Sequence, residues 1–99
     1  MFVIFLTFAD KPKAPPLMED HKSWIKRGFE NDLFVAAGSL ASGQGGVILA
    51  PNAERKHLED FIRTDPFVQH GVVTPEIIEI SLSRTDPRLD FLSALNQSG

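Results

Sequence analysis

Hydrophobic side chains recur along the chain at two different spacings, which predict four strands and two helices. Residues 2–9 are rich in Phe and β-branched side chains, as strands are, and both of their alternating sets are largely apolar. We therefore expect this first strand to be covered on both faces. Further strands are expected over residues 33–40, 47–50 and 72–82, and a glycine-rich turn over 42–46 joins the first two of these.

Two longer segments have the spacing of amphipathic helices. The apolar stripe of the first recurs at i, i+4, i+7, i+8, i+11 and i+12, and consists of Leu17, His21, Trp24, Ile25, Gly28 and Phe29. Asn31-Asp32 ends this helix. The second helix is expected over about 53–63, with Asn52 as its N-cap. Residues 10–16 contain three prolines and are expected to form a loop before the first helix.

Shorter elements are expected after the second helix. Asp65 can cap a short turn over residues 67–70, which the following glycine closes. Pro75 indicates that the last strand lies at a sheet edge or carries a bulge, because proline cannot donate a ladder hydrogen bond. We expect the domain to cover residues 1–83, and the tail over 84–99 to form a short helix that packs on the domain or on a partner.

The predicted element order is β-α-β-β-α-β, which indicates an α+β fold of the ferredoxin-like type. In this fold, two helices cover one face of a four-stranded antiparallel sheet. The first strand is apolar on both faces, and an open apolar face favours the pairing of two copies. We expect a homodimer that forms through the sheet faces, and the alternative is that the C-terminal tail folds over the sheet.

Composition and charge exclude several classes of protein. The 99 residues suffice for one domain, and the absence of cysteine excludes a disulfide scaffold, a thiol nucleophile and a zinc-thiolate site. The net charge is −3 and the longest basic cluster is Lys26-Arg27, so no nucleic-acid partner is expected. The apolar N-terminus is too short to span a membrane and lacks the features of a signal peptide. We therefore expect a cytoplasmic protein without a membrane partner.

His21 is the strongest candidate for chemistry, because a partly buried imidazole is the usual general acid or base. The alternative is a core histidine whose nitrogens are satisfied by backbone carbonyls, and the helix pattern alone favours that alternative. Asp65 has two interpretations as well: a helix cap, which is the stronger one for this residue alone, or a carboxylate that orients an imidazole. The two residues form a catalytic pair only if the fold brings them together.

The other histidines are weaker candidates. His57 is expected to be solvated on the second helix, and His70 is expected to end the short turn. The three histidines lack an HxH or HExxH spacing, so we predict no metal site.

Several short motifs follow one another in a recognisable order. They begin with Phe2-Val3-Ile4, His21 followed by Trp24 and Gly28, and a small-residue segment that ends in Gly38-Ser39. They continue with Gly45-Gly46-Val47, Asp65-Pro66-Phe67 ahead of Gly71-Val72, and Glu76-Ile77-Ile78-Glu79. In this combination the chain resembles the YCII-related (YciI-like) family over about residues 1–83.

The resemblance implies a dimeric α/β barrel of ferredoxin-like subunits, with His21 and Asp65 as an active-site dyad. One branch of the family is similar to a dehydrochlorinase that removes HCl from a chlorinated hydroxyquinol. Structural cousins on the barrel include muconolactone isomerase and small monooxygenases. Many members have Gly-Pro where this chain has Gly38-Ser39, which implies a different pocket rim.

Two functional hypotheses follow. In the first, a cofactor-independent enzyme uses His21 and Asp65 for proton transfer on a small cyclic or aromatic oxygenated substrate, as in elimination or isomerisation. The cavity of this enzyme would be lined by Trp24, Gly38, Ser39 and Phe67. In the second, the chain is a non-catalytic small-molecule-binding or accessory protein on the same barrel, and the pair is structural.

Overall fold

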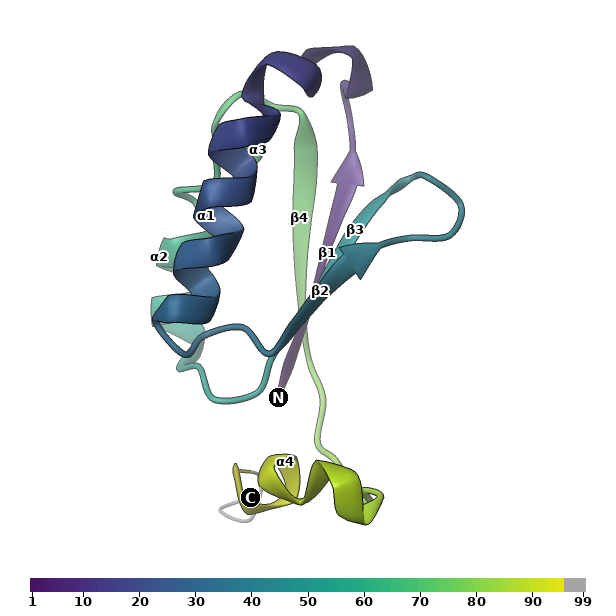
Figure 1. Ribbon diagram of the computed structural model, residues 1–99, viewed down its shortest axis with the longest axis vertical. Helices are drawn as coiled ribbons and strands as arrows, with labels where there is room; N and C mark the ends of the chain where they lie inside the picture. Colours follow the sequence, from purple (N-terminus) through teal and green to yellow (C-terminus); the bar gives the residue numbers. More distant parts are fainter. Residues whose placement is uncertain (96–99) are drawn as a thin grey trace.

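The computed structural model describes the backbone of residues 1–95 and the side chains of residues 1–92 (Figure 1). Its four strands are β1 (Phe2–Phe8), β2 (Ala36–Ser39), β3 (Gly45–Ala50) and β4 (Val73–Glu79). Its α-helices are α1 (Met18–Glu30), α2 (Arg55–Ile62), α3 (Pro66–Gln69) and α4 (Asp90–Leu95). Three single 3₁₀ turns complete the described elements: η1 (Lys11–Lys13), η2 (Pro15–Leu17) and η3 (Pro87–Leu89).

The four strands form one antiparallel sheet in the order β2-β3-β1-β4, and α1 and α2 lie on the same face of it (Figure 1). The molecule is therefore an α+β domain, and this arrangement is compatible with the predicted ferredoxin-like fold. Pro75 lies in β4, which is an edge strand, as predicted from the missing donor of proline.

The helix-covered face of the sheet holds the core. Phe2, Ile4 and Leu6 of β1 point to this face and are buried, as are Ile48 and Ala50 of β3. The helices contribute Trp24, Leu58 and Ile62, each at most 2% exposed. Burial of apolar area on this scale is the main favourable term in folding.

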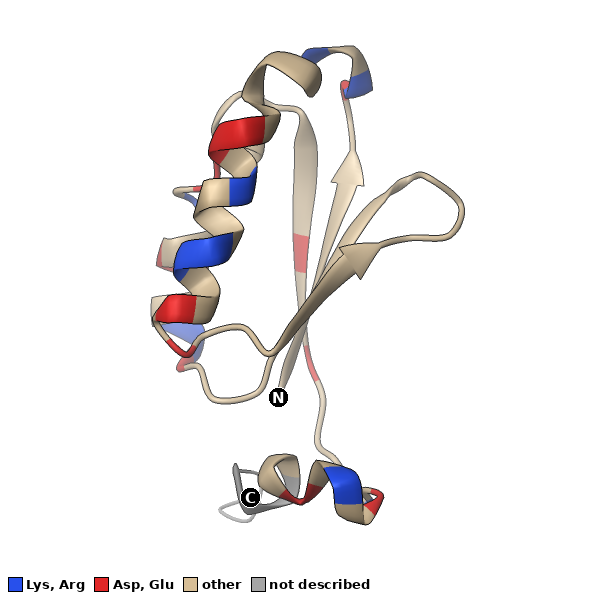
Figure 2. Ribbon diagram, viewed as in Figure 1, with Lys and Arg blue, Asp and Glu red and all other residues tan. Residues whose placement is uncertain are grey.

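The other face of the sheet is mainly apolar, with Glu76 of β4 beside Phe5, and no helix of the described residues covers it. Leu49, Val3 and Ile78 lie side by side across β3, β1 and β4, with Phe5 of β1 two residues further along. Val3, Phe5 and Leu49 are only half-buried, and Ile78 is 38% exposed. Strands β1, β2 and β3 carry no charged residue, and Figure 2 shows the charges of the domain mainly on the helices and turns. Within one chain, β1 is thus covered on one face rather than on both.

A close contact between α1 and the segment after it sets where β2 begins. A Cβ atom on Gly28 would lie 2.1 Å from Cδ2 of the buried Phe34 ring, so only glycine lets the helix pass this close. The backbone N–H groups of Leu33 and Phe34 donate to the Gly28 carbonyl, at 2.9 and 3.1 Å. Because these two residues hold the end of the helix, the strand predicted over 33–40 is shortened to Ala36–Ser39.

Further boundaries also differ from the prediction. β3 begins at Gly45 rather than at residue 47, so the predicted turn over 42–46 is shorter. Residues 10–16 are not an irregular loop but include η1 and the start of η2, because proline fits the first turn of a short helix. The second helix begins at Arg55 with Glu54 as its N-cap, so Asn52 does not cap it. The last strand ends at Glu79 rather than at residue 82.

The tail forms η3 and α4, which agrees with the predicted helical turns. Figure 1 shows both elements beyond the end of the sheet at which β1 begins, and not over either face. The alternative in which the tail covers the sheet is therefore not observed over residues 84–95, and residues 96–99 lie outside the described part. No helix among the described residues is long and apolar enough to cross a membrane.

Candidate functional site

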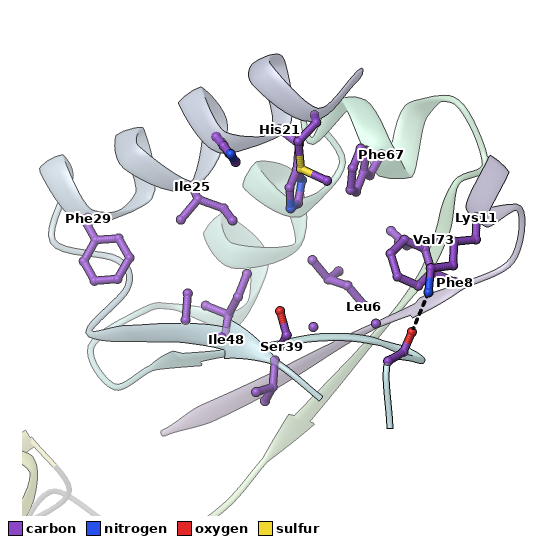
Figure 3. Close-up of a pocket in the computed structure, with 18 residues that line it drawn as sticks. Leu6, Phe8, Lys11, His21, Ile25, Phe29, Ser39, Ile48, Phe67 and Val73 are labelled. Atoms are coloured by element: carbon purple, nitrogen blue, oxygen red, sulfur yellow. Dashed lines mark hydrogen bonds between the residues drawn. The ribbon is translucent and has the colours of Figure 1, made fainter. Parts of the chain in front are cut away.

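A cavity of about 580 Å³ lies between α1 and the helix-covered face of the sheet (Figure 3). Its helical wall consists of Met18, His21, Lys22, Ile25 and Phe29. Its floor comes from all four strands and includes Leu6, Phe8, Ser39, Ile48 and Val73. Phe67 of α3 completes the wall beside His21. The volume and the mainly apolar lining are typical of a site for a small organic ligand.

His21 and Asp65 meet at the inner wall of this cavity. The distance from His21 Nδ1 to Asp65 Oδ1 is 2.7 Å, within hydrogen-bond range. The His21 side chain is 12% exposed and lines the cavity, whereas the Asp65 side chain is fully buried behind it. Opposite an ionised carboxylate, which only accepts, Nδ1 of a neutral imidazole would donate and Nε2 would keep its lone pair. The fold thus brings the two residues together.

Stacking fixes the plane of the imidazole. The rings of His21 and Phe67 are parallel within 6°, and their centroids lie 3.9 Å apart. The Trp24 ring lies further away, at 5.8 Å and 24°. With Nδ1 held by Asp65 and one ring face held by Phe67, the imidazole has little freedom to turn out of its position.

The local sequence explains how Asp65 reaches this place. Asp65 has an extended backbone and its Oδ1 accepts from the Phe67 N–H at 3.0 Å, which makes it the N-cap of α3. Pro66 follows at the first helical position, where its missing N–H is not needed. Asp65 Oδ2 is buried and has no hydrogen-bond partner among the described residues. Oδ1 thus serves both the helix cap and His21, and both interpretations of Asp65 hold at once.

The remaining predicted site residues divide into two groups. Gly38, Ser39 and Phe67 line the cavity, as expected. Trp24 does not line it, although it was expected to, because its ring is fully buried between α1 and α2. The Trp24 Nε1–H donates to the Phe61 carbonyl at 3.1 Å and to Thr64 Oγ1 at 3.0 Å, so this residue ties the two helices together.

Several residues that line the cavity were not predicted from the sequence to do so. Met18, Ile25 and Phe29 lie on the helix face of His21, and the helical spacing already contained this information. Lys22 follows His21 directly, but a lysine on a helix is usually only solvated. Lys11 lies in a proline-rich turn, and no local sequence pattern indicates that its side chain lines a cavity.

The cavity rim is basic. Lys11 Nζ donates to the Gly43 carbonyl at 3.3 Å and lies 5.3 Å from the centroid of the Phe8 ring. Both contacts hold its ammonium group where the β2–β3 turn meets η1 (Figure 3). None of the described residues that line the cavity is Asp or Glu.

The other two histidines lie where they were predicted. His57 is exposed on α2, and His70 is the C-cap of α3: its backbone N–H donates to the Pro66 carbonyl at 3.0 Å, and the Gly71 N–H donates to the Val68 carbonyl at 3.2 Å. Within the described part of the chain, no group of three or more His, Asp and Glu side chains could hold a metal ion.

Comparison with known proteins adds no further constraint on the site. No protein-family model matches this chain, and no curated protein matches it either.

Proposed function

We propose that the cavity binds a small cyclic or aromatic oxygenated molecule and that His21, oriented by Asp65, moves a proton on it without a cofactor. The observation that carries the proposal is the 2.7 Å contact between His21 Nδ1 and Asp65 Oδ1 beside an apolar cavity. A fixed imidazole with a buried carboxylate partner is the arrangement of a general base. Ferredoxin-like architecture and the resemblance to the YCII-related family support the same reading.

The chemistry follows from the protonation of the imidazole. With Nδ1 donating to the Asp65 carboxylate, Nε2 would be the nitrogen that accepts a proton from a ligand. When Nε2 takes a proton from carbon, the C–H electron pair forms a double bond and expels a leaving group, or it forms an enolate that the imidazolium reprotonates elsewhere. Asp65 stabilises the imidazolium in both cases. Elimination and isomerisation therefore need no redox partner.

We propose further that two copies pair through their uncovered sheet faces to form a dimeric α/β barrel. The half-buried Val3, Phe5 and Leu49 and the exposed Ile78 would leave water at such an interface. Each Å² of apolar area buried there contributes about 25 cal/mol. Because the cavity lies on the opposite, helix-covered face, pairing would leave its lining within one subunit.

Asp65→Asn tests the role of the pair. The amide oxygen can still cap α3 and accept from His21, but the negative charge that stabilises the imidazolium is gone. We expect proton transfer to fall by at least about tenfold. The measurement is deuterium incorporation from D₂O, followed by NMR, for a panel of small cyclic ketones and hydroxylated aromatic compounds.

The matched control for this variant is Asp60→Asn, which changes an exposed carboxylate on α2 in the same way. It should exchange at the wild-type rate. Equal rates for the wild type and Asp65→Asn, on every compound that the wild type exchanges, would contradict the proposed role of the pair.

Phe5→Glu tests the proposed dimer. Phe5 lies at the centre of the uncovered face, between Val47 of β3 and Glu76 of β4, and a charge there cannot be buried against a second sheet. We expect light scattering after gel filtration to give one chain mass for Phe5→Glu and twice that mass for the wild type. His57→Glu, on the exposed side of α2, should stay dimeric. A wild-type protein that runs as a monomer would rule the dimer out.

A further inference from the structure

The rim of the cavity indicates which kind of molecule it selects. We infer that the cavity selects an anion: a small apolar ring that carries a carboxylate, phenolate or enolate oxygen, with Lys11 and Lys22 holding the negative group. This inference rests on the proposed function, because it names the substrate class of the same site.

The first argument is the charge of the lining. The chain as a whole has a net charge of −3, yet two lysines line this cavity and none of its described lining residues is acidic. A cleft with charges of one sign and low-dielectric walls concentrates ligands of the opposite sign. The local charge is thus opposite to that of the whole chain, and it favours an anionic ligand.

The second argument is the placement of Lys11. Its ammonium group is held by the Gly43 carbonyl at 3.3 Å and by the Phe8 ring at 5.3 Å. An ammonium group has three N–H donors, so the bond to Gly43 leaves two for a ligand. A lysine that two neighbours already hold at the rim loses less side-chain entropy when it binds an anion. Lys13, two residues away, instead pairs with Asp10 at 3.4 Å and does not line the cavity.

The third argument is how the polar groups are distributed. Lys22 follows His21 on α1, so a cation and the proposed base share one wall. Lys11 approaches from η1, which is a separate element. The rest of the lining is mainly apolar and includes Leu6, Ile25, Phe29 and Ile48. This arrangement suits a ring with a charged oxygen at its edge, because the ring would contact apolar side chains and the oxygen would contact an ammonium group.

An anionic ligand also fits the proposed chemistry. Removal of a proton from carbon develops negative charge on the adjacent oxygen of the ligand. A nearby ammonium group stabilises that charge more in the transition state than before the proton moves. The lysines would therefore contribute to both binding and rate.

The test compares two ligands of the same shape and different charge. 2-Naphthoate and 2-naphthamide share a bicyclic ring, and only the first is an anion. We expect the wild-type protein to bind the carboxylate about fivefold or more tightly than the amide, as measured by NMR titration. Raising the ionic strength should reduce this preference, because salt screens exposed charges.

Variants assign the preference to the two lysines. The double variant Lys11→Met and Lys22→Met should bind both ligands with similar affinity, since the methionines keep apolar contact and remove charge. The double variant Lys13→Met and Lys26→Met changes the net charge equally at exposed positions outside the lining, and it should keep the preference. Circular dichroism of each variant checks that the fold is retained.

The possible results separate this inference from the proposed function. Equal wild-type affinity for the two ligands overturns the inference, and deuterium exchange still decides the function. A preference that persists in the Lys11 and Lys22 double variant, or that the Lys13 and Lys26 double variant also loses, overturns the assignment to these lysines. If the wild type binds neither ligand, the inference fails together with its premise of an aromatic-ring site.

Discussion

His21→Gln should reduce the rate of deuterium incorporation by about 10²–10⁴-fold, the usual contribution of a positioned general base. Glutamine is of similar length and can donate a hydrogen bond to Asp65, so the buried carboxylate keeps a partner. It cannot take up a proton at neutral pH. The variant therefore removes the proton acceptor and disturbs the wall of the cavity as little as possible. Exchange is measured on whichever compound the wild type exchanges fastest.

His57→Gln is the matched control, because His57 is exposed on α2 and does not line the cavity. It should keep the wild-type rate. If His21→Gln exchanges as fast as the wild type, proton transfer by His21 is excluded. A clear fall in melting temperature with no change in exchange would favour the alternative hypothesis, a binding protein in which His21 and Asp65 form a structural pair.

Trp24→Ala should lower the free energy of unfolding by about 3–5 kcal/mol, the usual cost of removing a large aromatic side chain from a core. The Trp24 ring is fully buried, stacks on Phe61 with centroids 5.2 Å apart, and meets Phe34 edge-on at 5.5 Å. Small domains have only about 5–15 kcal/mol in total, so this loss is a large part of the stability. Urea unfolding followed by circular dichroism is the measurement, because Trp24 is the only tryptophan and its fluorescence is lost in the variant.

Trp24→Phe separates packing from hydrogen bonding. The Phe61 carbonyl keeps a donor in Thr64 Oγ1, at 2.6 Å, so the lost indole N–H leaves no orphaned acceptor there. We expect a smaller loss, about 1–2 kcal/mol. Affinity for cavity ligands should stay unchanged in Trp24→Phe, since the ring does not line the cavity. A loss below about 1 kcal/mol in Trp24→Ala would contradict the structural role assigned to this residue.

The order of the elements was predictable from the sequence because each of them has a strong local signal. β1 is continuous and apolar, α1 has a long stripe, and Asp65-Pro66 begins α3 as its cap and first residue. The boundaries that differ depend on contacts between distant segments. β2 starts late because Leu33 and Phe34 bond to Gly28, and no local pattern contains that information.

The candidate site was predictable in part. The pairing of His21 with Asp65 required two helices to lie side by side, which the expected fold supplied and the local pattern did not. The error at Trp24 has a geometric cause. Successive helix residues point about 100° apart, so Trp24 and Ile25 lie on opposite sides of His21 on one wide stripe. Ile25 faces the cavity and Trp24 faces α2. Helical periodicity alone does not indicate which side of the stripe faces the cavity and which faces the second helix.

The three residues Asp65-Pro66-Phe67 have a consequence for protein design. This short segment supplies both a carboxylate for one nitrogen of an imidazole and a ring for its face, and it caps its own helix while doing so. A designer who needs an immobilised histidine usually has to place each supporting residue separately. Here one tripeptide at the start of a helical turn, set opposite a histidine on a neighbouring helix, provides the whole support and could be grafted as a single unit.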